Sequence, residues 1–298
     1  MKVYLFINEK SGGVQKQGVD AIIAKTSDIL KRHDRYDLEV VSGDFKALIT
    51  TAKTLRNQDN IAYFITAGGD GTQSAIASII RHRPIALLPL PCGTVNELCR
   101  DLKIPLTINE ALDACLSGSI RLIDVGIIDE RVFLNNVVFG AYATLAEARE
   151  TLRDAETITE VTVGVANAAE AILKAEPMRF RVEIDNSTLH LDTNTIVVSN
   201  NIISRAENLV PKRDRIDEGV LAVYLSEANH GGDFTALLAE FVASGAQNAA
   251  QIDIQKCKHC KVMSVEPMFS YTIDGDPVES SKPVNISVDA KCLRVAAP

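Results

Sequence analysis

Residues 61–73 read IAYFITAGGDGTQ, an apolar run that leads directly into a loop rich in glycine. The run from Ile61 to Ile65 is β-branched and aromatic, which favours a buried strand. The pattern after the loop predicts a helix from about Gln73, with Thr72 as a candidate N-cap. Such a turn is typical of an anion site, because the first amides of a helix have no partner within it. The glycines that let the backbone approach a phosphate are Gly68, Gly69 and Gly71.

The flanking sequence repeats this alternation of short apolar runs with helical spacing. Continuous apolar strands that alternate with helices predict a parallel sheet buried on both faces. Such sheets bind ligands at the carboxyl ends of their strands. The predicted strands are 3–7, 38–41, 61–65 and 85–88, and the predicted helices lie around 19–30, 47–55, 76–80 and from about Val95.

Two further loops follow predicted strands at the same sheet edge. Gly93 and Thr94 follow the fourth strand and can offer an amide and a hydroxyl to a phosphate, with Asn96 just beyond them. The first strand ends in Asn8-Glu9-Lys10-Ser11-Gly12-Gly13. The parallel-sheet rule predicts that all three loops face one crevice.

The loops match neither the Rossmann glycine spacing nor a P-loop. Asp70 would repel a phosphate unless a divalent metal or a substrate hydroxyl lay nearby. The phosphate charge must therefore be balanced by Mg²⁺, by loop amides and by Lys10.

The second half of the chain is strand-rich. Met178 to Ile184 alternates apolar with charged residues, and Asp185-Asn186-Ser187 offers a turn into Leu189 and Leu191, which predicts a hairpin with one buried face. Val284 to Val288 alternates in the same way, and helical spacing recurs at 161–172 and 234–241. This pattern predicts a second, mostly antiparallel domain.

Composition excludes several classes of protein. The chain has 298 residues, 46% of them hydrophobic, and a net charge of −8, which is the wrong sign for a general nucleic-acid binder. No apolar run reaches the roughly 18–20 residues that span a bilayer, and the N-terminus does not resemble a signal peptide. We therefore expect a cytoplasmic protein that meets membranes only peripherally, with its six cysteines reduced.

Taken in order, these motifs resemble the diacylglycerol kinase catalytic-domain family, which includes bacterial lipid kinases and sphingosine kinases. Gly68 to Thr72 matches the signature loop of the family, and Asn8 to Gly12 resembles its first motif, with Glu9 in place of proline. Nearly the whole chain takes part in the resemblance. The other matching segments are Cys92 to Glu97 with Arg100, Asp124 to Gly126, Phe133 to Asn135 with Gly140, Pro211 to Gly219 and Asp274 to Asp276.

The resemblance implies an α/β nucleotide-binding domain with a parallel sheet in three layers, followed by an antiparallel β-sandwich, with the active site in the interdomain cleft. It places the first domain at residues 1–123 and 290–298 and the second at 124–289. ATP would be the phosphoryl donor and a lipid hydroxyl the acceptor. Contact with the membrane would be transient, and a homodimer is left open.

The resemblance also implies the role of each site residue. Asp274 would be the general base with Asp276 as its helper, and Asp70 would help to bind the nucleotide and magnesium. A structural Mg²⁺ would lie at the turn of Glu218, with the backbone carbonyls of Arg215 and Val220, and Asp124 is counted with the metal-binding residues. The implied nucleotide contacts are Asn8, Lys10, Ser11, Gly12, Gly68, Gly69, Gly71, Thr72, Gly93, Thr94 and Asn96.

Several alternatives stay open. An ordinary β-turn is also compatible with Ile273-Asp274-Gly275-Asp276-Pro277. Glu218 is likewise compatible with an exposed turn residue that binds no metal. An NAD kinase shares the signature loop. A member that binds lipid or nucleotide without turnover is also compatible, because Ala75 and Asp276 stand where the family has glutamate. Cys257-Lys258-His259-Cys260 could be half a zinc site, although two reduced thiols are the simpler interpretation.

Overall fold

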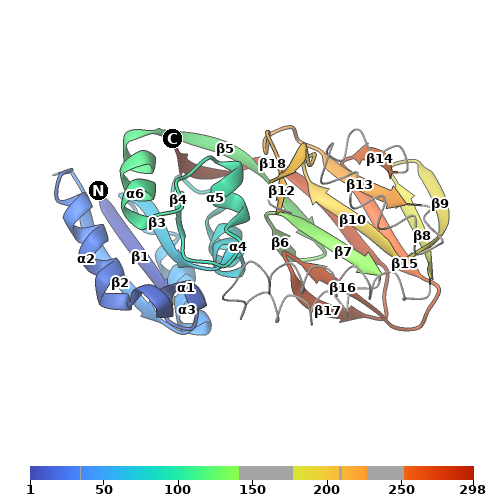
Figure 1. The fold of residues 1–298 in the computed structure, drawn as a ribbon, viewed down its shortest axis with the longest axis horizontal. Helices are drawn as coiled ribbons and strands as arrows, with labels where there is room; N and C mark the ends of the chain where they lie inside the picture. Colours follow the sequence, from blue (N-terminus) through green and yellow to red (C-terminus); the bar gives the residue numbers. More distant parts are fainter. Residues whose placement is uncertain (34, 141–176, 208–209, 227–251) are drawn as a thin grey trace. The chain divides into compact units, whose positions relative to one another are not determined.

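The computed structural model describes residues 1–33, 35–140, 177–207, 210–226 and 252–298 (Figure 1). The chain divides into one unit of residues 1–125 and 289–298 and another of residues 126–288. The two helices predicted at 161–172 and 234–241 lie outside the described residues.

The first unit is built on a parallel sheet. Strands β1 (Lys2–Asn8), β2 (Asp37–Gly43), β3 (Ile61–Gly68) and β4 (Ala86–Pro91) run in the order β2-β1-β3-β4. The end of β18 (Val284–Ala297) adds to β4 in parallel through Arg294 and Val295. β3 and β4 are almost wholly buried because both faces of the sheet are covered, as their continuous apolar sequence requires.

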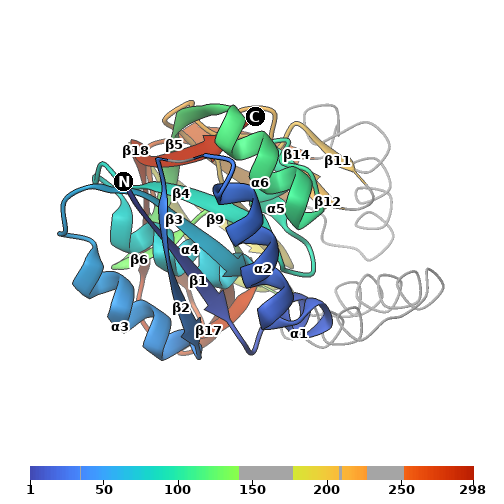
Figure 2. The same cartoon turned by 90° about the vertical axis from the view of Figure 1, so that its left-hand side faces the viewer.

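Helices cover both faces of this sheet (Figure 2). α2 and α6 pack together on one face, and α3 and α4 pack together on the other. In α2 the buried positions are Ile22, Thr26, Ile29 and Leu30, which form one helical stripe. The helices are α1 (Gly12–Gln17), α2 (Val19–Leu30), α3 (Phe45–Leu55), α4 (Asp70–Ile80), α5 (Glu97–Asp101) and α6 (Ile108–Ser117).

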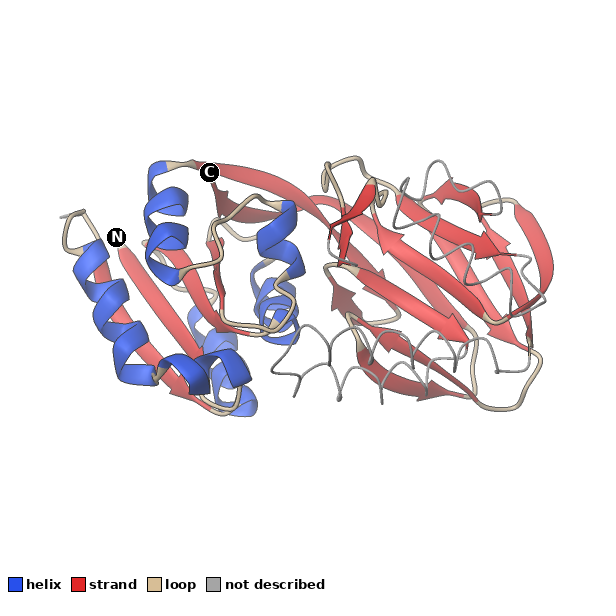
Figure 3. Cartoon of the chain, in the orientation of Figure 1, coloured by secondary structure: helices blue, strands red, loops and turns tan. Residues whose placement is uncertain are grey.

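The described part of the second unit contains strands and loops only (Figure 3). One antiparallel sheet has the order β14-β13-β10-β7-β16-β17, and β15, β8 and β9 extend antiparallel from the start of β18 in the other. The strands are β5 (Ser119–Ile128), which enters from the first unit, β6 (Arg131–Phe133), β7 (Asn136–Gly140), β8 (Met178–Ile184), β9 (Ser187–Thr193), β10 (Thr195–Asn200), β11 (Arg205–Glu207), β12 (Val210–Lys212), β13 (Leu221–Ser226), β14 (Ile252–Cys257), β15 (His259–Ser264), β16 (Phe269–Ile273) and β17 (Asp276–Ser280).

The inward faces of these two sheets share one apolar core. Phe139, Phe180 and Phe269 lie in it with the aliphatic residues of β10, β13 and β15. The predicted hairpin is β8–β9, and its buried face is the apolar one. The α/β unit and the antiparallel sandwich confirm the fold class predicted from the sequence.

The six cysteines are all free and buried. Within the described residues, none of the helices has the length and apolar character needed to cross a membrane.

Candidate active site

Three loops meet at the carboxyl edge of the parallel sheet. They follow β1, β3 and β4, which are adjacent and parallel, so their ends lie at one edge. We call them the first loop (residues 8–13), the glycine loop (68–72) and the third loop (92–96). The sequence predicted that these loops face one another, and side-chain contacts join all three.

The first loop packs against the third. The hydroxyl of Ser11 donates to the carbonyl of Cys92 at 2.9 Å. Gly13 lies so close that a Cβ at this position would stand 2.2 Å from the same carbonyl oxygen, so a side chain cannot fit. Lys10 donates its amide to Asn8 Oδ1 at 3.2 Å, and its side chain is exposed.

The glycine loop opens α4 one turn earlier than predicted. The helix begins at Asp70 with Gly69 as N-cap, and the amide of Thr72 already bonds to the carbonyl of Gly69 at 2.9 Å. The expectation that Thr72 caps the helix is therefore wrong, because Thr72 lies inside its first turn. Its hydroxyl instead accepts from Asn8 Nδ2 at 3.0 Å, which ties the first loop to the glycine loop.

The third loop is closed by its own asparagine. Asn96 Oδ1 accepts the amide of Gly93 at 2.7 Å, and Asn96 Nδ2 donates to the carbonyl of Gly93 at 3.0 Å. The helix predicted from about Val95 begins only at Glu97, and Asn96 precedes it in a left-handed conformation with φ 57°. Gly93 and Thr94 therefore lie in a turn before a short helix and do not start it.

Asp70 joins the glycine loop to the start of α5, directly after the third loop. Its Oδ1 accepts the amide of Glu97 at 3.1 Å. A Cβ on Gly93 would stand 3.0 Å from the Cα of Gly69, so the two loops approach as closely as glycine allows. Backbone amides at the start of α4, small residues around them and one carboxylate are a donor set that fits a nucleotide phosphate with Mg²⁺.

Cysteine chemistry is absent from this edge as far as the described residues go. Burial raises the pKa of the Cys92 thiol to about 12 and that of Cys99 well above its usual value. Both thiols are therefore protonated at neutral pH and poor nucleophiles.

Asp274 lies in the second unit, in the turn between β16 and β17. Ile273 pairs with Asp276, and both central residues have positive φ, 47° at Asp274 and 89° at Gly275, which is the geometry of a tight hairpin turn. The β-turn interpretation of this segment is thus structurally right. It does not exclude a chemical role, because the Asp274 side chain is held in a specific way.

The carboxylate of Asp274 accepts three backbone amides. Oδ2 accepts from Leu134 at 2.8 Å, and Oδ1 accepts from Asn135 at 2.8 Å and from Asn136 at 3.1 Å. Donors of this kind stabilise the ionised carboxylate and fix its orientation. Asp276 follows at the start of β17 and is exposed.

Arg213 is a site residue that sequence reasoning missed. It is buried, and its guanidinium donates to the carbonyls of Leu134 at 2.6 Å and Asn200 at 2.8 Å and to Asn135 Oδ1 at 2.9 Å. Arg213 thus binds the segment whose amides hold Asp274. Two arginines, Arg213 and Arg215, lie between Pro211 and Asp217, and the sequence gives no signal that the first of them is buried, because arginine is usually exposed.

The turn of Glu218 is organised by Arg215. The guanidinium of Arg215 donates to Asp217 Oδ1 at 3.1 Å and lies 3.8 Å from Glu218 Oε1. The Val220 carbonyl accepts the amide of Asn201 at 3.0 Å, and Asn201 Oδ1 accepts that of Glu218 at 2.9 Å. A cation bound by the Glu218 carboxylate would compete with the Arg215 guanidinium. The predicted magnesium site stays a prediction.

Asp124 is fully buried in the first unit, and its Oδ1 accepts the amide of Lys291 at 2.8 Å. This contact fixes the backbone of β18 beside β5. Asp124 belongs to a different unit from Glu218, and its assignment to metal binding also stays a prediction.

Comparison with known proteins gives the family. Residues 2–128 match the family described as diacylglycerol kinase catalytic domain, and residues 136–297 match the one described as YegS C-terminal NAD kinase beta sandwich-like domain. Together the two matches cover both units.

Individual relatives agree. "Probable lipid kinase YegS-like" of Pectobacterium atrosepticum is 31% identical over 144 residues, 47% of this chain and 46% of that protein. "Probable lipid kinase YegS" of Escherichia fergusonii is 25% identical over 191 residues, 62% and 60% of the two chains. "Diacylglycerol kinase" of Staphylococcus saprophyticus is 34% identical over 88 residues, 29% of each chain. The matched segments span less than two thirds of each of these relatives.

The fold has close counterparts among solved structures. A crystal structure of a diacylglycerol kinase from Bacillus anthracis superposes with a TM-score of 0.71, at 18% identity, over 100% of this chain and 97% of that one. A second structure from the same strain gives a TM-score of 0.75. At this identity the likeness concerns the fold, whereas the sequence matches to both domains carry the assignment. The chain therefore belongs to the diacylglycerol kinase catalytic-domain family of lipid kinases.

Proposed function

We propose that the protein transfers the γ-phosphoryl group of ATP, bound with Mg²⁺, to the hydroxyl group of a lipid. The observation that carries the proposal is the contact of the three loops at one sheet edge. Asn8 and Ser11 bind the first loop to the other two, and Asp70 binds the glycine loop to the start of α5. The resemblance to lipid kinases supplies the reaction class.

In the first unit, the amides at the start of α4 and the third loop would bind the phosphates of ATP. Phosphoryl transfer depends mostly on positioning and charge neutralisation, and Mg²⁺ supplies the latter when it is bound. Gly69, Gly71 and Gly93 keep side chains away from the backbone donors. Asp70 would help to bind the Mg²⁺ that accompanies the nucleotide. Lys10 would reach the phosphates from the first loop.

In the second unit, Asp274 would act on the acceptor. The lipid oxygen forms a bond to the γ-phosphorus, the bond from that phosphorus to the β-bridging oxygen breaks, and ADP leaves. The hydroxyl proton passes to the Asp274 carboxylate. Because three amides already stabilise the ionised carboxylate, we expect proton transfer late in the reaction. Asp276 would orient Asp274 or share its proton.

A lipid acceptor requires contact with a membrane surface. We infer a cytoplasmic protein that docks transiently, because a net charge of −8 opposes lasting attraction to anionic lipid. The same charge makes nucleic acid an unsuitable partner. A homodimer remains compatible with this function.

A second candidate is a family member that binds ATP and lipid without turnover. The specific observation in its favour is that both oxygens of Asp274 are hydrogen-bonded to the backbone, an arrangement that would equally serve to hold residues 134–136 in place. This candidate predicts nucleotide binding without product.

The deciding experiment presents the full-length protein with Mg²⁺, radiolabelled ATP and hydroxylated lipids in mixed micelles. The panel contains diacylglycerol, phosphatidylglycerol, a sphingoid base and an undecaprenol-like alcohol. Label in one lipid product supports the kinase and identifies its acceptor. ATP binding by calorimetry without label in any lipid would favour the non-catalytic candidate.

A further inference from the structure

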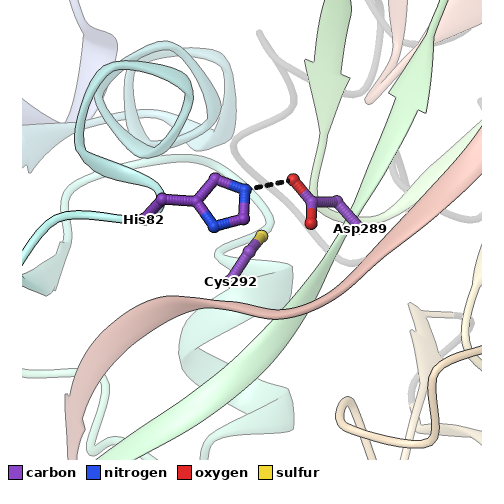
Figure 4. A group of neighbouring side chains, drawn as sticks. All are labelled: His82, Asp289 and Cys292. Carbon is purple, nitrogen blue, oxygen red and sulfur yellow. Dashed lines mark hydrogen bonds and ion pairs between the residues drawn. The ribbon is translucent and has the colours of Figure 1, made fainter.

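A cluster of potential metal ligands lies in the first unit, where the turn after α4 meets β18 (Figure 4). His82, Asp289 and Cys292 each offer one ligand atom, and these atoms all lie within 4.8 Å of one another. His82 Nε2 points at Asp289 Oδ2 from 2.7 Å. No other group of three such residues was found in the described part of the chain.

The backbone builds this cluster from two unusual conformations. His82 has φ 59° and Lys291 has φ 50°, both in the left-handed region that residues other than glycine rarely adopt. The amide of His82 donates to the carbonyl of Cys292 at 2.7 Å, and the amide of Lys291 is held by Asp124 at 2.8 Å. These bonds place the imidazole and the thiol side by side.

A neighbouring arginine holds the carboxylate of this cluster in place. Arg81 donates to Asp289 Oδ2 at 3.1 Å, which fixes the carboxylate. Cys292 Sγ lies beside this carboxylate, within 4.8 Å of the ligand atoms of both Asp289 and His82.

We propose that His82 Nε2, Asp289 and Cys292 Sγ form a binding site for Zn²⁺. Zinc takes imidazole nitrogen, carboxylate oxygen and thiolate sulfur in a tetrahedron whose ligand atoms are about 3.3–3.5 Å apart, so adjustments of about 1 Å would complete the set. A thiolate and an imidazole select zinc over magnesium, which prefers oxygen.

Binding proceeds by exchange of protons for metal. Zn²⁺ takes the place of the Sγ–H proton, which leaves to solvent. It also replaces the hydrogen bond between His82 and Asp289, so Nε2 gives up its proton and the neutral ring carries its proton on Nδ1. The His82 ring is largely exposed, so water completes the tetrahedron from that side. Arg81 keeps its contact with the carboxylate and orients it from behind the ligand shell.

The zinc would join the end of α4 to β18 and stabilise the first unit. The nucleotide loop lies at the other end of α4, 11 residues away and thus about 16 Å along the axis. The site therefore does not depend on the proposed kinase activity, and its test needs none.

The experiment uses the full-length protein stripped of metal with a chelator. Titration with Co²⁺, a spectroscopic substitute for Zn²⁺, is expected to give a thiolate-to-cobalt charge-transfer band that saturates at one ion per chain. Competition with a chromogenic chelator then gives the zinc affinity. Cys292→Ser should abolish the band, and His82→Asn should weaken zinc binding at least about tenfold. Asparagine tolerates the left-handed backbone at position 82 and cannot replace the imidazole.

The matched control is the double variant C257S/C260S, which removes two neighbouring cysteines outside the cluster. It should keep the band and the affinity. Absence of a thiolate band in the wild type, its persistence in Cys292→Ser, or its loss in the control would overturn the proposal. If Cys292→Ser fails to fold by circular dichroism, unchanged zinc affinity in His82→Asn would overturn it by itself.

Discussion

Asp274 and Arg213 bind the same three-residue segment through opposite ends of its peptide groups. The carboxylate of Asp274 accepts the amides of residues 134–136, whereas the guanidinium of Arg213 donates to the carbonyls of Leu134 and, more weakly, Asn135. The anionic carboxylate at the N–H groups and the cationic guanidinium at the C=O groups each make stronger hydrogen bonds than neutral partners would. The position of the proposed base therefore depends on a buried cation from another part of the second unit.

The third loop gives the sharpest test of nucleotide binding. A Cβ on Gly93 would stand 3.0 Å from Asn96 Oδ1 and from Gly69 Cα, so Gly93→Ala should push the loops apart. We expect ATP affinity, measured by calorimetry, to fall at least about tenfold, or about 1.4 kcal/mol. The unfolding midpoint should change little.

Lys53→Ala is the control for this prediction. Lys53 is exposed on α3 and lies outside the three loops, so ATP should keep its affinity in this variant. Equal affinities for the wild type and Gly93→Ala would argue against binding of phosphate at the third loop.

Two substitutions at the turn of Glu218 should have opposite effects on Mg²⁺ binding. Glu218→Gln removes the proposed ligand and should weaken Mg²⁺ binding. Arg215→Gln removes the guanidinium that lies on Asp217 and Glu218 but keeps the backbone carbonyl, so it should strengthen Mg²⁺ binding. The readout is the Mg²⁺ dependence of the thermal unfolding midpoint. A midpoint in the wild type that does not respond to Mg²⁺ would rule out an ion at this turn.

We expect one substitution at Asp276 to raise the proposed lipid kinase activity. Its carboxylate is exposed at the start of β17 and is one methylene shorter than the glutamate of the family. Asp276→Glu should raise lipid kinase turnover, and Asp276→Asn should lower it by less than Asp274→Asn does. A loss of turnover in Asp276→Glu would contradict this prediction and would indicate that this site requires the shorter aspartate side chain.

Buried thiols predict a loss of stability at alkaline pH. Burial raises the pKa of Cys92 and Cys115 to about 12 from 9.0, so the unfolded chain releases these protons first. Between about pH 9 and 12 the unfolded state binds fewer protons than the native state, and the free energy of unfolding falls as pH rises. Urea unfolding at about pH 8 and 10 measures the slope, which Cys115→Ala should make shallower. The same slope in both proteins would contradict this cause.

The sequence predicted the parallel sheet and the three loops because both depend on local patterns. Apolar strands such as β3 lead into glycine turns, and parallel neighbours bring their ends together. Loop geometry was less predictable. The helix after the glycine loop begins at Asp70, before the predicted Gln73, and the helix after the third loop begins at Glu97, after the predicted Val95. Helix boundaries of this kind depend on which backbone carbonyl bonds first.

Contacts between distant segments could not be predicted in this way. His82 and Cys292 are 210 positions apart, and they meet through two left-handed residues that no sequence pattern marks. Arg213 likewise looks like a surface residue until the burial of its guanidinium is seen. Such pairs depend on the tertiary fold, which periodicity does not encode.

The role of Asp274 is tested most directly by comparing Asp274→Asn with Arg213→Lys for both turnover and stability. Asparagine puts an amide NH₂ against backbone N–H donors, and lysine keeps the charge but loses the planar fork, so each should cost about 1–3 kcal/mol in urea unfolding. If Asp274 is the base, Asp274→Asn should also lose turnover by about 10²–10⁴ with ATP affinity retained, whereas Arg213→Lys should lose less than about tenfold. Near-full turnover in Asp274→Asn, or equal losses of turnover in the two variants, would contradict the assignment and make Asp70 the next candidate for the base.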